Sequence, residues 1–111
     1  MGILKSSETV TYRDFVLLRV ILISTSEGET LKFQQLKDEI NLYLRVNEIG
    51  LDKASPVAGN GPLQADIAKL RQFGFLAPTG PYRLTPAGTF LMQTYDRDTF
   101  PAAGLNLKEK N

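Results

Sequence analysis

The segment FVLLRVILI, residues 15–23, is apolar at every position except Arg19. It is too short to cross a membrane, which takes about 20 apolar residues. On a helix over residues 11–24 these side chains point in nearly every direction, and a helix that is apolar all round is buried on more than one side. Either the C-terminal helix or a second subunit must therefore cover the side that the domain core leaves open.

Composition limits the chemistry available to this chain of 111 residues. It contains neither cysteine nor histidine, so disulfides, thiolate metal sites and the commonest general base are excluded. We expect one domain without enzymatic activity, metal or cofactor. No signal-peptide pattern is present, which predicts a cytoplasmic protein with no membrane partner. The formal net charge is +1 at pH 7, so the chain as a whole is not a strong electrostatic binder of nucleic acid.

Hydrophobic periodicity defines the remaining elements. Apolar residues at spacings of three and four predict helices over residues 34–46, 61–73 and 86–96. Residues 29–33 are expected to form a short strand or an extended entry to the next helix. Residues 47–62 are rich in glycine and proline, which predicts a long loop.

The stretch TGPYRLTPAG, residues 79–88, combines a turn with a helix start. Gly80 tolerates a positive φ and Pro81 fixes its own, so together they predict a tight reversal between two short apolar runs, which is a β-hairpin. Thr85 is suited to cap the helix that follows, and Pro86 fits its first position because its missing N–H is not needed there.

A longer pattern resembles the winged helix-turn-helix family. A helix of the form L-x-x-D-I-x-x-L is followed by a glycine, an apolar run, a turn and then Y-x-L-T-x-x-G. The residues that carry the pattern are Leu63, Asp66, Ile67, Leu70, Gly74, Phe75, Leu76, Tyr82, Leu84, Thr85 and Gly88. The resemblance implies an α+β, mostly helical fold with a three-helix core, a short β-hairpin wing and an additional C-terminal helix.

Domain boundaries follow from this resemblance. We expect a flexible N-terminus over residues 1–10, a winged-helix domain over residues 11–96 and a partly disordered tail over residues 97–111. The loop 47–62 departs from the family pattern, because the two helices of a helix-turn-helix usually meet through a turn of about three or four residues.

The resemblance also implies a function. Helix 61–73 would be the recognition helix of a sequence-specific protein that binds double-stranded DNA, and the hairpin 74–85 would be its wing. Such a protein would be a small transcriptional regulator. The candidate DNA-binding residues are Gln64, Lys69, Arg71, Gln72 and Arg83, since amides read adenine and cations bind phosphate or guanine.

An alternative is a winged-helix module that binds protein or serves as a subunit of a larger complex. The near-neutral charge and the few polar groups on helix 61–73 favour it. In either case we expect a homodimer, because helix 11–24 would otherwise expose a contiguous apolar surface that monomers rarely carry. The residues assigned to that interface are Phe15, Leu18, Ile21 and Leu22.

Overall fold

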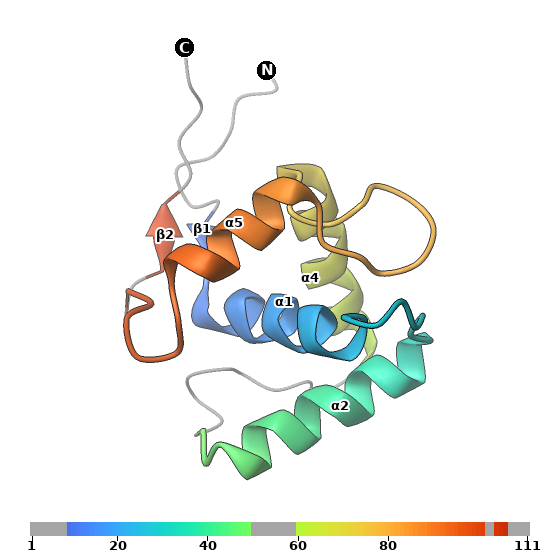
Figure 1. The fold of residues 1–111 in the computed structure, drawn as a ribbon, viewed down its shortest axis with the longest axis horizontal. Coiled ribbons are helices and arrows are strands. Elements are labelled where there is room, and N and C mark those ends of the chain that lie inside the picture. The colour runs from blue at the N-terminus through green and yellow to red at the C-terminus, as the bar shows by residue number, and fades with distance from the viewer. Residues whose placement is uncertain (1–8, 50–59, 102–103, 107–111) are drawn as a thin grey trace.

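The structure is a computed structural model that describes residues 9–49, 60–101 and 104–106. Its elements in chain order are β1 (Thr9–Val10), α1 (Tyr12–Ser24), α2 (Phe33–Val46), α4 (Asn60–Phe73), α5 (Pro86–Thr94) and β2 (Leu105–Asn106) (Figure 1). The described part of the chain is therefore α+β and mostly helical, as predicted. None of its helices is long and apolar enough to cross a bilayer.

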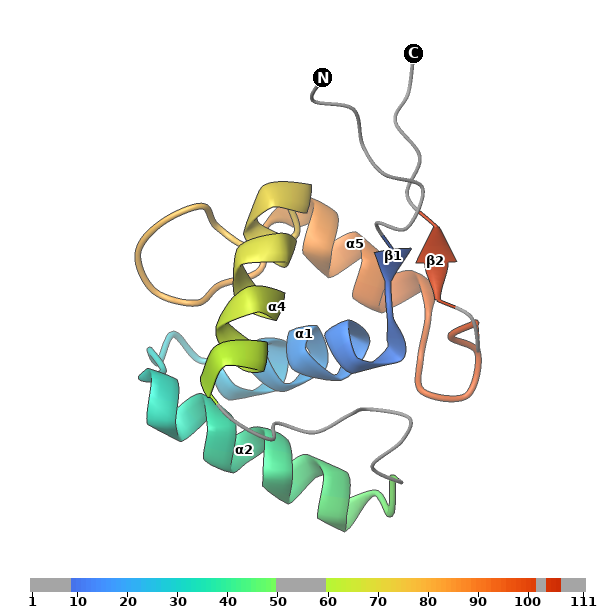
Figure 2. The same cartoon turned by 180° about the vertical axis from the view of Figure 1, so that it is seen from behind.

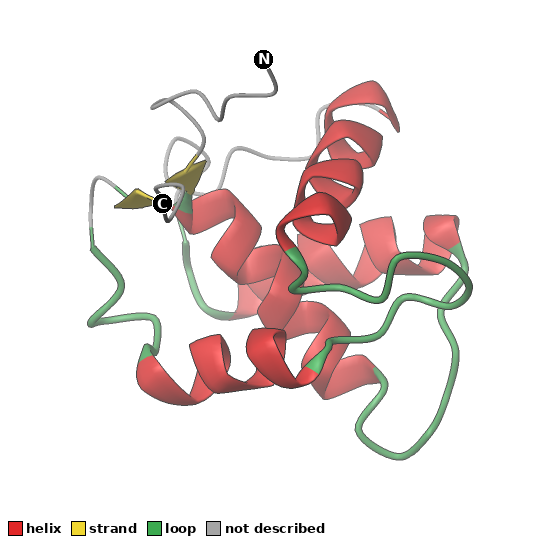
Figure 3. Cartoon of the chain, turned by 90° about the horizontal axis from the view of Figure 1, so that it is seen from above, coloured by secondary structure: helices red, strands yellow, loops and turns green. Residues whose placement is uncertain are grey.

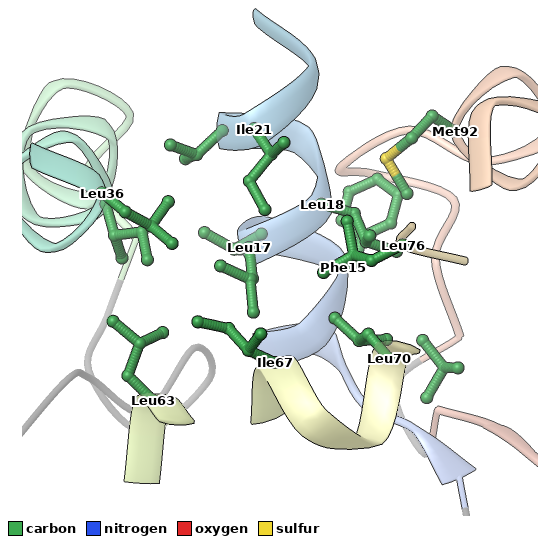
Figure 4. Close-up of a cluster of buried hydrophobic side chains, with 14 of the residues drawn as sticks. Phe15, Leu17, Leu18, Ile21, Leu36, Leu63, Ile67, Leu70, Leu76 and Met92 are labelled. Atoms are coloured by element: carbon green, nitrogen blue, oxygen red, sulfur yellow. The ribbon is translucent and has the colours of Figure 1, made fainter. Parts of the chain in front are cut away.

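Helix α1 occupies the centre of the molecule. It packs between α2 on one side and α5 on the other, while α4 crosses it (Figures 1 and 2). Figure 4 shows the contact from within, where Leu17 and Ile21 of α1 meet Leu36 of α2 and Ile67 of α4. The central position explains why this helix is apolar nearly all round, since three other helices surround it.

The far side of α1 is covered by the chain's own C-terminal segment. Phe100 is buried, and its ring lies 4.8 Å from that of Phe15. The residues assigned to a dimer interface do not lie on the surface, because Phe15, Leu18 and Ile21 are at most 1% exposed within a single chain. Leu22 is partly buried against the same core. Phe15, Leu18 and Ile21 therefore cannot contact a second subunit.

The folded unit extends beyond the expected limits of 11–96. Strands β1 and β2 pair antiparallel, with Val10 opposite Leu105, and Val10 is fully buried. Gly104 has a φ of 85° and lies so close to this pair that a Cβ would sit 2.7 Å from the Val10 carbonyl oxygen. The predictions of a flexible 1–10 and a partly disordered tail therefore need correction at these positions. Residues 1–8 and 107–111 lie outside the described part.

The hairpin is present as a turn with one bridge rather than as two paired strands. Leu76 and Leu84 form that isolated antiparallel bridge. The Ala77 N–H donates to the Arg83 carbonyl at 2.9 Å, and Gly80 has the expected positive φ of 81°. Seen from above, the hairpin projects as a loop between the end of α4 and the start of α5 (Figure 3).

The other segments follow the sequence with small differences. The Thr85 side chain accepts from the Gly88 N–H and Pro86 opens α5, so the predicted helix start is confirmed. Residues 29–32 form no strand, Lys32 is extended, and α2 begins at Phe33. Most of the predicted loop 47–62 falls on residues 50–59, which lie outside the described residues.

Candidate nucleic-acid interface

The outward side of α4 carries the amides predicted to contact DNA. Leu63, Ile67 and Leu70 are buried on one side of this helix. Gln64 and Gln72, two turns apart, are exposed on another. Ala68 is exposed midway between them, and its small side chain leaves space between the two amides. This part of the predicted site therefore reaches solvent as a single strip along the helix.

Arg71 fastens the hairpin to α4. Its two terminal nitrogens donate to the carbonyl oxygens of Pro78 at 3.1 Å and of Gly80 at 3.0 Å. Its guanidinium also lies 5.5 Å from the ring centroid of Tyr82, in cation–π contact. Arg71 was predicted as a DNA contact, and its role as a brace of the hairpin was missed. No pattern in the sequence identifies which carbonyl groups an arginine will bind.

The positive charge of Arg71 has no carboxylate partner among the described residues. Its Nε–H is buried without an acceptor in the same part of the chain. Both hairpin bonds are to neutral carbonyls, and the Tyr82 ring is the other group in contact with the charge. The side chain remains partly exposed beside the α4 strip.

Arg83 is the exposed cation of the hairpin. Its Nη2 makes one long hydrogen bond, 3.5 Å, to the carbonyl oxygen of Gly28 in the turn after α1. A bond of this length to a neutral acceptor holds an exposed arginine weakly. Arg83 is thus free to exchange this carbonyl for a stronger anionic partner.

Lys69 is drawn into the interior and does not join the α4 strip. Its Nζ lies 2.5 Å from a carboxylate oxygen of Asp14, a side chain with no exposed surface, and donates to the Thr9 carbonyl at 3.2 Å. Lys69 was predicted to contact DNA, but Asp14 and the Thr9 carbonyl hold its ammonium group. Position 69 lies on the side of α4 that is next to the start of α1. A lysine at this position therefore reaches the buried carboxylate of Asp14.

A second ion pair joins the same two helices. Arg13 donates from Nε and Nη2 to the two oxygens of Asp66, at 2.7 and 2.9 Å. This two-pronged bond raises the pKa of Arg13 above its ordinary value. We call Arg13, Asp14, Asp66 and Lys69 the charge cluster. It ties the first turn of α1 to α4 and lines neither of the hollows described below.

Asp14 is the most buried member of the charge cluster. Burial raises the pKa of its carboxyl group, against the opposing effect of the hydrogen bonds from Lys69 and from the Thr11 backbone. One of its oxygens, Oδ1, has no hydrogen-bond partner among the described residues. Thr11 and Asp14 also form a capping box at the start of α1. That T-x-x-D spacing was visible in the sequence, whereas the ion pair with Lys69 was not.

A hollow of about 330 Å³ lies between the start of α2, the middle of α4 and the hairpin. We call it the α4–hairpin hollow. Its walls are mostly apolar, with two polar side chains from the predicted site. The lining residues are Phe33, Gln64, Ile67, Ala68, Arg71 and Tyr82. The structure thus brings Gln64 and Arg71 to one concave surface, with Gln72 farther along α4 and Arg83 on the hairpin.

A second hollow, of about 180 Å³, lies between α1 and α2. We call it the α1–α2 groove. Three large apolar side chains at its edge are exposed to solvent, namely Ile23 at 55%, Leu42 at 42% and Val46 at 67%. Glu39 also lines it. This groove was not predicted, because residues 34–46 have the pattern of an ordinary amphipathic helix.

The described residues contain no group of three or more carboxylate, histidine or cysteine side chains that would hold a metal ion. No protein-family model, no curated protein and no solved structure matches the chain. The winged-helix resemblance accordingly stays a prediction.

Proposed function

We propose that this protein binds double-stranded DNA sequence-specifically, as a small cytoplasmic transcriptional regulator of the winged-helix type. In this proposal α4 reads bases and the hairpin lies along the backbone beside it. The observation that carries it is the brace made by Arg71, which joins the hairpin turn to the last turn of α4. Two amides on α4 and a cation on the hairpin thereby belong to one rigid surface.

The chemistry of this surface fits base reading better than charge-driven binding. Gln64 and Gln72 can each bond an adenine edge through donor and acceptor, and Ala68 leaves room for a thymine methyl group. Arg83 supplies the phosphate contact. Lys69 is left out of the proposed contact set because Asp14 already holds it. Because few cations are free to bind phosphate, we expect the DNA affinity to depend only weakly on salt. The slope of log affinity against log salt concentration is about −0.9 for each phosphate neutralised.

Fluorescence anisotropy with labelled genomic fragments tests this function directly. The full-length chain is titrated into each fragment at low and at moderate salt. We expect a subset of fragments to bind more tightly than bulk DNA at both salt concentrations. Failure to bind any fragment at low salt would rule out the proposal, since phosphate contacts are strongest there.

The change of Arg83 to alanine gives a residue-level prediction. We expect weaker binding to every DNA sequence and a salt slope smaller by about 0.9, because one phosphate contact is lost. The matched control is Arg97→Ala. Arg97 is also exposed but lies in the segment after α5, where it donates to the carbonyl of Asn47 at the C-terminal end of α2, at 3.0 Å. Equal slopes in wild type and Arg83→Ala would remove Arg83 from the interface.

A second candidate function, the binding of a protein partner, is favoured by the α1–α2 groove. We propose that its occupant is a second copy of this chain. An antiparallel two-fold packing of α2 centred on Leu42 would bury the apolar edge of the groove. It would also set Glu39 of one copy at the level of Arg45 of the other, and because both side chains are exposed on α2, opposite charges would lie at the same level along the interface. This dimer is compatible with DNA binding, because the groove and α4 use different surfaces.

The change of Leu42 to glutamate tests the dimer. A charge at the centre of the packing should shift the chain to monomer, since an unpaired buried carboxylate is costly. Sedimentation at micromolar concentration measures the shift. Phe90→Glu is the control, because Phe90 is 67% exposed on α5, outside the groove. A wild-type chain that sediments at 12.3 kDa would contradict the dimer.

A further inference from the structure

The α4–hairpin hollow combines features of a small-molecule site that DNA reading does not require. It lies beside an arginine whose charge has no carboxylate partner among the described residues. Two of its walls are aromatic rings, Phe33 and Tyr82. We propose that this hollow binds a small carboxylic acid with an apolar, ring-containing body.

The carboxylate recognition rests on Arg71. Its terminal nitrogens now donate to two neutral carbonyl oxygens, those of Pro78 and Gly80. These bonds are already strengthened by the charge on the guanidinium, and a carboxylate would add the attraction of an opposite charge and a bidentate fit. A carboxylate that enters the hollow would therefore compete with the Pro78 and Gly80 carbonyls for the terminal nitrogens of Arg71. Arginine also suits this ligand because its planar fork matches the geometry of a carboxylate.

The apolar body of the ligand rests on the walls. Phe33 is the first residue of α2, Ile67 and Ala68 come from α4, and Tyr82 comes from the hairpin. A volume of about 330 Å³ lies at the small end of ligand pockets, which span roughly 300–1,000 Å³. One ring with a short acidic side chain fits this size. Gln64 offers an amide at the rim for a further polar group.

Occupation of the hollow would affect the proposed DNA surface. Gln64 and Ala68 belong to both, so an acid in the hollow covers part of the reading strip. It also draws Arg71 away from the carbonyls that hold the hairpin. We therefore infer that the acid lowers DNA affinity. This consequence rests on the proposed function, whereas binding of the acid itself does not.

The test uses three probes and the full-length chain labelled with nitrogen-15. Phenylacetate has a ring and a carboxylate, 2-phenylethanol has the ring alone, and acetate has the charge alone. We expect saturable shifts of the amide signals around the hollow with phenylacetate, with Kd on the order of 1 mM for so small a ligand. The other two probes should bind at least tenfold more weakly. Absence of saturation with phenylacetate, or equal binding of 2-phenylethanol, would overturn the proposal.

Two variants, each with one alanine of α4 replaced by phenylalanine, locate the site. Ala68→Phe fills the hollow but leaves the bonds of Arg71 to the hairpin in place, and we expect at least a tenfold loss of phenylacetate affinity. Ala65→Phe is the control, because Ala65 is exposed on the same helix but does not line the hollow. Equal binding by both variants would place the ligand elsewhere and overturn the assignment. The comparison of the three probes needs no variant, so it decides the matter even if Ala68→Phe misfolds.

A DNA-binding measurement separates the proposed acid site from the proposed DNA-binding function. Anisotropy with a bound fragment is repeated in the presence of phenylacetate, and we expect the DNA affinity to fall. If no fragment binds at all, the DNA function fails while the amide shifts still report on the acid site. If DNA binds and phenylacetate shifts the amide signals without changing the DNA affinity, the inferred competition is wrong.

Discussion

Replacement of Lys69 by methionine is expected to lower the free energy of unfolding by about 3 kcal/mol. Removing one partner of a buried ion pair leaves the other charge unpaired, at a cost of about 3–5 kcal/mol. We place this case at the lower end because the Lys69 side chain is 29% exposed, although that of Asp14 is fully buried. Urea denaturation at pH 7, followed by circular dichroism, measures the loss.

The double variant Asp14→Asn/Lys69→Met is the matched control. Asparagine at position 14 keeps an acceptor for the Thr11 N–H, which donates to Asp14 at 3.0 Å, but carries no charge. Because burial already raises the pKa of Asp14, the charged form is disfavoured even beside Lys69. We therefore expect the double variant to lie within about 1 kcal/mol of the wild type. If it is as unstable as Lys69→Met alone, the loss comes from packing and not from the stranded charge.

The loss in Lys69→Met should also depend on pH. The pKa of Asp14 in the folded chain lies above its ordinary value, and removal of the lysine takes away a hydrogen bond that lowers it. The penalty for the charged carboxylate is then fully present above the folded pKa and shrinks as the pH falls toward the unfolded value. Denaturation at acidic pH should show a smaller gap to the wild type than at pH 7. A gap that grows on acidification would contradict this reading of Asp14.

Local chemistry predicted the helices and their starts. The four described helices appear where apolar spacing placed them, within two residues at each end. Thr85 and Pro86 open α5 as expected, because a cap and its first turn involve only residues that are close in sequence. The turn at Gly80 was predicted for the same reason.

Contacts between distant segments were the part that the sequence left open. Apolar periodicity shows that a helix is buried but does not identify what covers it. The cover of α1 was therefore left open between the chain itself and a second subunit, and Phe100 supplies part of it. The pairing of β1 with β2 was missed because strands of two residues show no alternation. Pro101 and Gly104 made the tail look disordered, yet Gly104 is what allows the close approach to β1.

The candidate site was also predicted only where the direction of a side chain follows from its own helix. Gln64 and Gln72 are exposed on α4 as expected, since their direction follows from the buried stripe on the same helix. The directions of Lys69 and Arg71 depended on partners elsewhere in the chain, the carboxylate of Asp14 and the carbonyls of the hairpin. A long, flexible lysine or arginine at the edge of a buried helix face can extend into solvent or toward a partner in the chain. Hydrophobic periodicity does not decide between these two directions.

Gly88 is the position where the smallest substitution should have one of the largest effects. It lies in the first turn of α5, directly against the hairpin. A Cβ at this position would overlap the carbonyl oxygen of Phe75 and lie 3.2 Å from Cγ of Leu84. The Phe75 carbonyl is itself fixed, because it accepts from the Thr85 N–H at 3.0 Å. The glycine of the Y-x-L-T-x-x-G pattern is thus required by the close packing of α5 on the hairpin.

Gly88→Ala should therefore lower the free energy of unfolding by about 3 kcal/mol, since the overlap is with backbone that cannot move without breaking the Thr85 bond. Gly61→Ala is the control. Gly61 also lies in a helix, but a Cβ there meets no atom within 4 Å, so alanine should cost far less there than at Gly88. Urea denaturation of both variants measures the two effects. A neutral Gly88→Ala would mean that α5 can move away from the hairpin, and the brace between Arg71 and the hairpin would then be the main contact holding that loop in place.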